Sequence, residues 1–159
     1  MRVHQHGACV KREEAHCTGR SRGGLTTKIH ALVDRQGLPL QLVVTAGQQH
    51  DNLLAPKRMN GLRNKDMLLA DKAYDSHRIR NLANERGAWA NIPPKSNRKN
   101  PICFSPYLYR NRNEVERFFN RIKQYRRIAT RYKRLAENFL AFIKLAAIRL
   151  WLGAYESTP

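Results

Sequence analysis

The stretch from Tyr109 to Lys123 constrains the fold most, because its pattern predicts a helix with two different faces. It reads YRNRNEVERFFNRIK. At about 100° per residue, one stripe of such a helix is polar and consists of Tyr109, Arg112, Glu116 and Lys123. A neighbouring stripe is apolar and consists of Val115, Phe118, Ile122, Tyr125 and Ala129. We therefore predict a helix anchored in the core by its apolar stripe, with one carboxylate flanked by cations at the edge of that core.

Two starting points fit this helix. Ser105 and Pro106 can open it as N-cap and first-turn proline. Alternatively, Asn113 is the cap and Glu116 its partner in a capping box. That start would leave Tyr109 and Arg112 just outside the helix. Spacing alone leaves the structural and the functional interpretation of Glu116 about equally open.

A second informative pattern is an apolar run that ends in an acidic residue. Residues 67–70 form a short unbroken apolar run, typical of a central strand that is buried on both faces, and Asp71 ends it. Open α/β sheets place functional residues at the carboxyl ends of their strands. The structural alternative is that Asp71 caps the next helix, but Asp75 and Ser76 can already do so. We therefore favour a functional role for Asp71.

The remaining pattern predicts a single α/β domain over residues 1–152, followed by a loose tail at 153–159. Its other elements are the end of a strand at 1–7, an antiparallel hairpin of strands at 26–33 and 38–45, helices at 52–62 and 76–86, a strand at 88–92 and an apolar helix at 138–152, packed under the sheet. Gly87 and Gly153 are expected to end their helices. We interpret Asp34 as a turn residue and Asp51 as a helix cap.

Charge narrows the class of partner. The chain of 159 residues carries 30 Lys and Arg against 12 Asp and Glu, a net charge of +18. Such an excess destabilises a compact state by self-repulsion unless a polyanion is near, so we expect a nucleic acid as the partner. The candidate contacts are Arg20 and Arg22 in a glycine-rich loop, the cationic loop at 95–101, and Arg126, Arg127 and Arg131 among Tyr125 and Tyr132.

A membrane is the second candidate partner for such a charge. The longest apolar stretch, residues 139–152, carries Lys144 and Arg149 and is shorter than the ~20 residues of a span. No signal-peptide pattern opens the chain. We therefore expect no membrane association and a cytoplasmic, nucleoid-associated protein.

Histidines and cysteines gather near the start of the chain. The cluster comprises His4, His6, Cys9, His16 and Cys17. Its spacings fit none of the usual paired zinc knuckles, so a plain loop is favoured over structural zinc. With Cys103 the cysteines number three, which argues against a disulfide framework.

The polar stripe is also a motif. Tyr109, Arg112, Glu116 and Lys123 stand at the spacing Y-(2)-R-(3)-E-(6)-K, which resembles the signature of DDE transposases from bacterial insertion sequences. Three further stretches resemble the same family: GRSRGGLTTKIHALVD at 19–34, LLADKAYDS at 68–76 and RRIATRYKRL at 126–135. The resemblance runs from residue 1 to about residue 151, and four separate motifs in the right order make it specific.

This resemblance implies a fold and a chemistry. The fold is an RNase H-like mixed sheet flanked by helices, and the chemistry is metal-dependent cleavage and strand transfer at the ends of the insertion sequence. In that family three carboxylates hold two divalent cations; Asp71 matches the second carboxylate and Glu116 the third. The implied cofactor is Mg²⁺, or Mn²⁺, because hard cations take oxygen ligands. Arg112 and Lys123 are the implied DNA contacts, and Tyr109 would stack on a base or on the helix wall.

The first carboxylate of the family has no counterpart here, because its position falls just before residues 2–6. Asp34 comes too late in the chain to replace it. We therefore expect a truncated first strand, a second-frame or truncated product that is inactive alone, and a homo-oligomer when full length. Two alternatives stay open: a basic DNA-binding protein without chemistry, and an RNase H-like nuclease that lacks strand transfer.

Overall fold

The computed structural model describes residues 1–5, 19–21, 24–48 and 59–157. The chain forms two compact units, which we describe separately. Unit 1 comprises Met1–Gln49 and Glu114–Pro159, and unit 2 comprises His50–Asn113. The expected helix at 52–62 lies largely outside the described residues, as do Asp51 and most of the histidine and cysteine cluster.

Unit 1 is built on a five-stranded mixed sheet. Its strands are β1 (Arg2–Gln5), β2 (Gly19–Ser21), β3 (Gly24–Val33), β4 (Pro39–Ala46) and β7 (Thr130–Arg131). The order is β2-β3-β1-β7, and β4 also pairs with β3. All these pairs are antiparallel except β1 with β7, which is parallel. The expected strand at the start of the chain and the expected hairpin are both confirmed.

The turn of this hairpin has the predicted chemistry. The Asp34 carboxylate accepts hydrogen bonds from the backbone of Gln36 and Leu38, both at 2.9 Å. Gly37 adopts φ +78°, and a Cβ there would meet the Glu114 carboxylate at 3.1 Å. Asp34 is therefore a turn residue, as predicted, and the position of Gly37 favours glycine.

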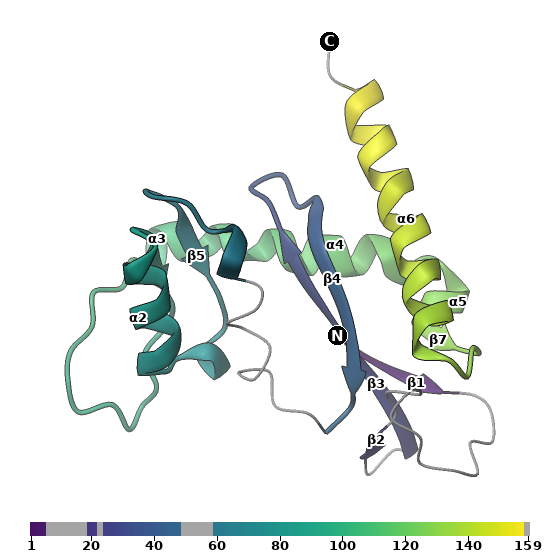
Figure 1. Ribbon diagram of the computed structural model, residues 1–159, viewed down its shortest axis with the longest axis horizontal. Coiled ribbons are helices and arrows are strands. Elements are labelled where there is room, and N and C mark those ends of the chain that lie inside the picture. Colours follow the sequence, from purple (N-terminus) through teal and green to yellow (C-terminus); the bar gives the residue numbers. More distant parts are fainter. Residues whose placement is uncertain (6–18, 22–23, 49–58, 158–159) are drawn as a thin grey trace. The chain divides into compact units, whose positions relative to one another are not determined.

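Among the described residues of unit 1, three helices accompany the sheet (Figure 1): α4 (Asn113–Lys123, its first residue in unit 2), α5 (Arg126–Ala129) and α6 (Ala136–Glu156). The core contains Val3, Ile29, Val44, Phe118, Ile122, Ile128, Phe139 and Ile143. Phe118 and Ile122 confirm the apolar stripe of α4, whereas Tyr125 and Ala129 are exposed and do not belong to the core. Only the middle of the predicted apolar stripe is therefore buried.

The terminal helix differs from its prediction. Gly153 does not end it; α6 continues to Glu156, and Ser157 Oγ donates to the Gly153 carbonyl at 2.6 Å. From its middle onward, four apolar side chains at offsets of three, seven and ten are exposed: Leu145, Ile148, Leu152 and Tyr155. In Figure 1 these yellow turns run away from β7. A large apolar stripe is thus open to solvent rather than packed under the sheet.

By length and composition α6 could also cross a membrane, contrary to the estimate from the sequence. This is weak support for a span, because the core helix of a soluble protein passes the same test. Lys144 and Arg149 lie inside the helix, where a bilayer would penalise their charge.

Unit 2 contains a two-stranded parallel sheet and short helices. The strands are β5 (Met67–Leu69) and β6 (Trp89–Asn91), and α2 (His77–Glu85) connects them. Single 3₁₀ turns lie at Met59–Gly61 and Lys72–Tyr74. The core comprises Met59, Ile79, Ala83, Ala88, Ala90 and Ile92. Ser76 Oγ caps α2, and Gly87 at φ +67° follows its end, both as predicted.

The place of β5 is the main correction to the expected fold. The sequence predicted a strand at the centre of one sheet, buried on both faces. Among the described residues β5 pairs with β6 alone, its Met67 is 39% exposed and its two leucines are half-buried. The mixed α/β class and the strand itself are confirmed, but a single sheet is not observed.

Candidate active site

Asp71 lies two residues beyond the end of β5, at the carboxyl edge of the small parallel sheet. Its backbone precedes the 3₁₀ turn Lys72–Tyr74, yet its side chain caps no backbone group of that turn. The carboxylate is half exposed. The sequence-based argument that Asp71 has no capping role is therefore confirmed, and its oxygens face other partners.

Those partners come from the helical run that starts at Ser105. Arg112 Nη2 lies 2.8 Å from Asp71 Oδ1, and the Tyr109 hydroxyl donates to the same oxygen at 3.4 Å. Tyr109 also packs edge-on against Phe104, with ring centroids 5.4 Å apart. Two members of the four-residue motif thus hold the acidic residue of another motif within unit 2.

The local sequence explains how these side chains are presented. Ser105 Oγ accepts from the backbone of Leu108 at 3.4 Å, and Pro106 opens α3 (Pro106–Tyr109). A 3₁₀ turn at Arg110–Arg112 follows and leads directly into α4. The first of the two predicted starting points is therefore correct.

The capping-box interpretation of Glu116 is wrong. An N-cap residue has extended backbone angles, whereas Asn113 has φ −58° and ψ −20° and is itself helical. Glu116 and Lys123 lie exposed on α4. Because Asp71 belongs to unit 2 and Glu116 to unit 1, their approach to one another stays a prediction.

Comparison with known proteins decides the family. The family described as "Transposase DDE domain" matches residues 1–151. The chain belongs to the DDE transposases. A Brucella ovis protein named as a transposase for insertion sequence element IS6501 is 37% identical over 129 residues, which cover 80% of this chain and 99% of that protein. No solved structure matches the chain.

The transposase carries a basic, aromatic cavity in unit 1. Arg126, Arg127, Tyr132, Lys133 and Phe142 line a volume of about 450 Å³. The guanidinium of Arg127 lies 5.9 Å from the Phe142 ring centroid, and the Lys133 ammonium lies 5.6 Å from it. Cations over an aromatic face attract its π-electrons, and such a surface suits a strand of nucleic acid. The structure thus brings Arg126 and Arg127 together beside an aromatic ring.

Arg131 requires a correction. Its side chain is fully buried, so it is not a DNA contact of this transposase. Its guanidinium donates to Thr27 Oγ1 at 2.6 Å, to the Lys133 carbonyl at 2.8 Å and to the Arg134 carbonyl. It also lies 5.3 Å from the Phe139 ring centroid. Arg131 therefore ties β7 to β3 from inside the core of unit 1.

Two other predicted contacts are not tested by the structure. Arg20 lies in β2 and Arg22 lies outside the described residues. Among the residues that the structure does describe, no group of three His, Cys, Asp or Glu could hold a metal ion. In the described part of the chain, the candidate active site therefore consists of Asp71 and its partners Arg112 and Tyr109.

The sequence reading missed one buried ion cluster. The sequence predicts Asp75 as a helix cap, but its side chain is buried and binds Arg80 and Arg98 instead, while Ser76 caps α2. The signal was present: two adjacent capping residues are one more than a helix needs.

Proposed function

We propose that this chain is a transposase that cleaves DNA and transfers strands at the ends of an insertion sequence, with Asp71 and Glu116 as its catalytic carboxylates. The observation that supports this most is the contact of Asp71 with Arg112 and Tyr109. A half-exposed acid at the end of a strand, without a capping role, is held by Arg112 and Tyr109. These two belong to the same signature as Glu116.

The residues fit the cofactor that the family implies. Asp71 offers exposed carboxylate oxygens, and hard divalent cations prefer such ligands. Asp71 and Glu116 would hold Mg²⁺, or Mn²⁺, which when bound supplies charge stabilisation to the phosphodiester under attack. Arg112, within reach of Asp71, can neutralise charge on a DNA phosphate, as can Lys123 on α4.

We infer an RNase H-like arrangement for this chemistry. A mixed sheet flanked by helices in unit 1 and a parallel strand pair in unit 2 are compatible with it.

A third carboxylate is needed for full activity. Two Mg²⁺ bring a charge of +4, and Asp71 with Glu116 return −2, while Arg112 and Lys123 add positive charge. Without another bridging acid the ions repel each other and the second binds poorly. We therefore propose that a third carboxylate completes this site and that activity without it is low.

The DNA surface of the proposal consists of Tyr109, Arg112 and Lys123 of the motif, Arg126 and Arg127 at the aromatic cavity, and Arg20 and Arg22. Its partners are the insertion-sequence ends and target DNA in the cytoplasm. A homo-oligomer fits the exposed apolar stripe of α6, since a patch of that kind is usually covered in an assembly.

The test is a strand-transfer assay with Mg²⁺ and duplexes that carry the element's own ends. It compares this chain, a version fused to the upstream reading frame, and that fusion with Asp71→Asn or Glu116→Gln. We expect joined products from the fusion and none from the other three proteins. Full activity in both substituted fusions would overturn the site assignment, and cleavage without joining would favour a nuclease. DNA binding without either reaction in the fusion would favour the non-catalytic alternative.

A further inference from the structure

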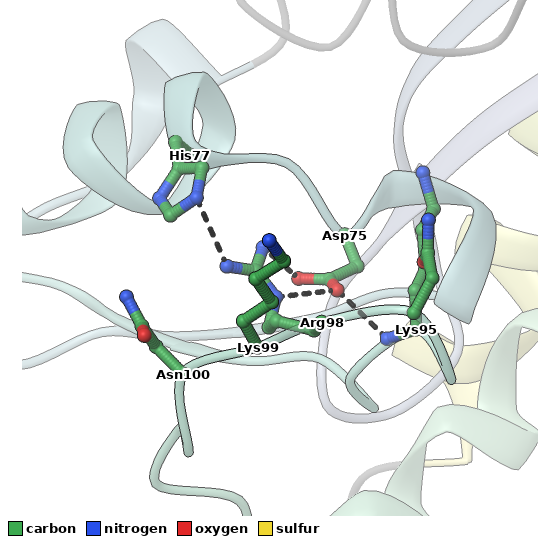
Figure 2. Close-up of a pocket in the computed structure, with 7 residues that line it drawn as sticks. Asp75, His77, Lys95, Arg98, Lys99 and Asn100 are labelled. Atoms are coloured by element: carbon green, nitrogen blue, oxygen red, sulfur yellow. Dashed lines mark hydrogen bonds and ion pairs between the residues drawn. The ribbon is translucent and has the colours of Figure 1, made fainter.

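A cavity in unit 2 is separate from Asp71 and has its own ion cluster. Its volume is about 430 Å³, and it is lined by Asp75, His77, Lys95 and residues 97–100 (Figure 2). The loop reads KSNRKNP at 95–101, so the lining combines cations with the amides of Asn97 and Asn100. This composition suits a ligand with several anionic oxygens.

The buried Asp75 carboxylate holds the loop in place through hydrogen bonds. Arg98 binds it with two nitrogens, Nη2 to Oδ1 at 2.7 Å and Nε to Oδ2 at 2.9 Å. The backbone N–H of Lys95 donates to Oδ2 at 2.8 Å. Burial alone would raise the pKa of Asp75, but the hydrogen bonds from Arg98, Lys95 and Arg80 outweigh it and hold that pKa well below its usual value. Asp75 is therefore ionised at neutral pH and accepts these hydrogen bonds beneath the loop.

Arg80 connects this anion to the sheet. Its Nε donates to Asp75 at 2.9 Å, and its two terminal nitrogens donate to the carbonyls of Ala90 at 2.9 Å and Ile92 at 2.7 Å. The loop, α2 and the end of β6 are thus tied to one carboxylate. A loop fixed in this way loses little conformational entropy when it binds a ligand.

Charge on the lining is unbalanced in favour of cations. Among the lining residues Asp75 contributes −1 and Lys95, Arg98 and Lys99 contribute +3, which leaves +2 at the cavity. No ion pair of Lys95 or Lys99 with a carboxylate is found in the part of the chain that the structure describes. With Arg98 occupied by Asp75, the two ammonium groups are the cations available to an incoming anion.

We propose that this loop is a binding site for the phosphodiester backbone of DNA, with Lys95 and Lys99 as the contacts and Asp75 as the positioning residue. The inference rests on the proposed function for the choice of DNA as the anion. The lysines of the cavity suit phosphates, which carry no sequence information, so we assign them to the backbone rather than to base sequence. It adds a second DNA-contacting surface in unit 2, apart from the residues of the motif.

The experiment measures binding of a duplex of arbitrary sequence by fluorescence anisotropy between about 50 and 200 mM salt. Lys95→Gln/Lys99→Gln removes two cations from the cavity. Arg63→Gln/Lys144→Gln removes two exposed cations elsewhere and serves as the matched control. If each lysine contacts a phosphate, the slope of log Kobs against log salt falls by about 0.9 per contact in the first variant and stays unchanged in the control. Equal slopes in both variants would overturn the inference.

The positioning role has its own measurement. Arg98→Lys keeps the charge but loses the two-nitrogen grip on Asp75. We expect weaker DNA binding and faster hydrogen exchange at residues 95–101, with the rest of unit 2 unchanged. If DNA affinity and hydrogen exchange at residues 95–101 are both unchanged, Asp75 does not position the loop. Salt-independent binding by the unsubstituted chain would instead count against the proposed function itself, whereas salt-dependent binding that ignores Lys95 and Lys99 refutes this site alone.

Discussion

The pairing of Arg112 with Asp71 leads to a quantitative expectation for metal binding. A cation that binds both oxygens of Asp71 must displace or share Oδ1, which Arg112 contacts at 2.8 Å, and a cation on Oδ2 would still lie beside the guanidinium. We expect Arg112→Gln to strengthen Mn²⁺ binding, because it removes both the competing contact and a nearby positive charge.

The size of this change in Mn²⁺ affinity follows from the solvent exposure of the two side chains. The Arg112 side chain is 25% exposed and that of Asp71 is 50% exposed, so the pair is screened by solvent. Pairs of this kind contribute about 0.2–1 kcal/mol. The Kd for Mn²⁺ should therefore fall by about 1.4- to 5-fold, and the gain should shrink in ~1 M salt, where the Debye length is about 3 Å.

The assay is an Mn²⁺ titration followed by electron paramagnetic resonance at low ionic strength. Arg63→Gln, which removes an exposed cation elsewhere in unit 2, is the control and should leave Kd unchanged. In an Asp71→Asn background the effect of Arg112→Gln should vanish, as a double-mutant cycle requires for a direct pair. Weaker Mn²⁺ binding in Arg112→Gln would refute the reasoning, since Arg112 would then support the metal ligand instead of competing with it.

Three further expectations concern stability and assembly. Arg131→Gln should lower unfolding stability by about 2–4 kcal/mol in thermal denaturation, because carbonyls and packing in the core lose their partner, and the reasoning fails if stability is unchanged. The pKa of Asp75 is lower in the folded chain than in the unfolded chain, so its ionised form stabilises the fold. This contribution to folding stability is present above the unfolded pKa and is lost as the pH falls below that value toward the folded pKa. Acid titration of unfolding should show this slope, and Asp75→Asn should lack it; equal slopes would contradict the pairing. Leu145→Lys with Leu152→Lys should convert an oligomer to a monomer in light scattering, whereas an unchanged mass would show that α6 is not the interface.

Local patterns predicted local structure well. Alternation over 26–45 and the Asp–Gly turn gave the hairpin, Ser105 with Pro106 gave the start of α3, and Gly87 gave the end of α2. Each depends on contacts between residues close in sequence. The same holds for the absence of a cap at Asp71, because Ser76, five residues further on, caps α2.

The errors concern partners that are distant in sequence. Arg131 sits in a run of exposed cations, and nothing local reveals that Thr27 and Phe139 enclose it. The role of Asp75 depends on Arg98, 23 positions away. Gly153 lowers helix propensity by about 1 kcal/mol, which the surrounding apolar helix tolerates. The pairing of β5 likewise depends on which strand it meets, and an apolar run does not specify that.

The convergence of Asp71 and Glu116 on one metal is the central claim, and metal-directed backbone cleavage tests it most directly. Fe²⁺ can replace Mg²⁺ at carboxylate sites, and with ascorbate and peroxide it produces radicals that cut the polypeptide near the bound ion. The experiment uses the DNA-bound chain, with cuts mapped by mass spectrometry and Asp71→Asn as control. We expect cuts near both residue 71 and residue 116, suppressed together by excess Mg²⁺ and lost together in Asp71→Asn. Cuts near one residue alone, or cuts near residue 116 that persist in Asp71→Asn, would contradict a shared site.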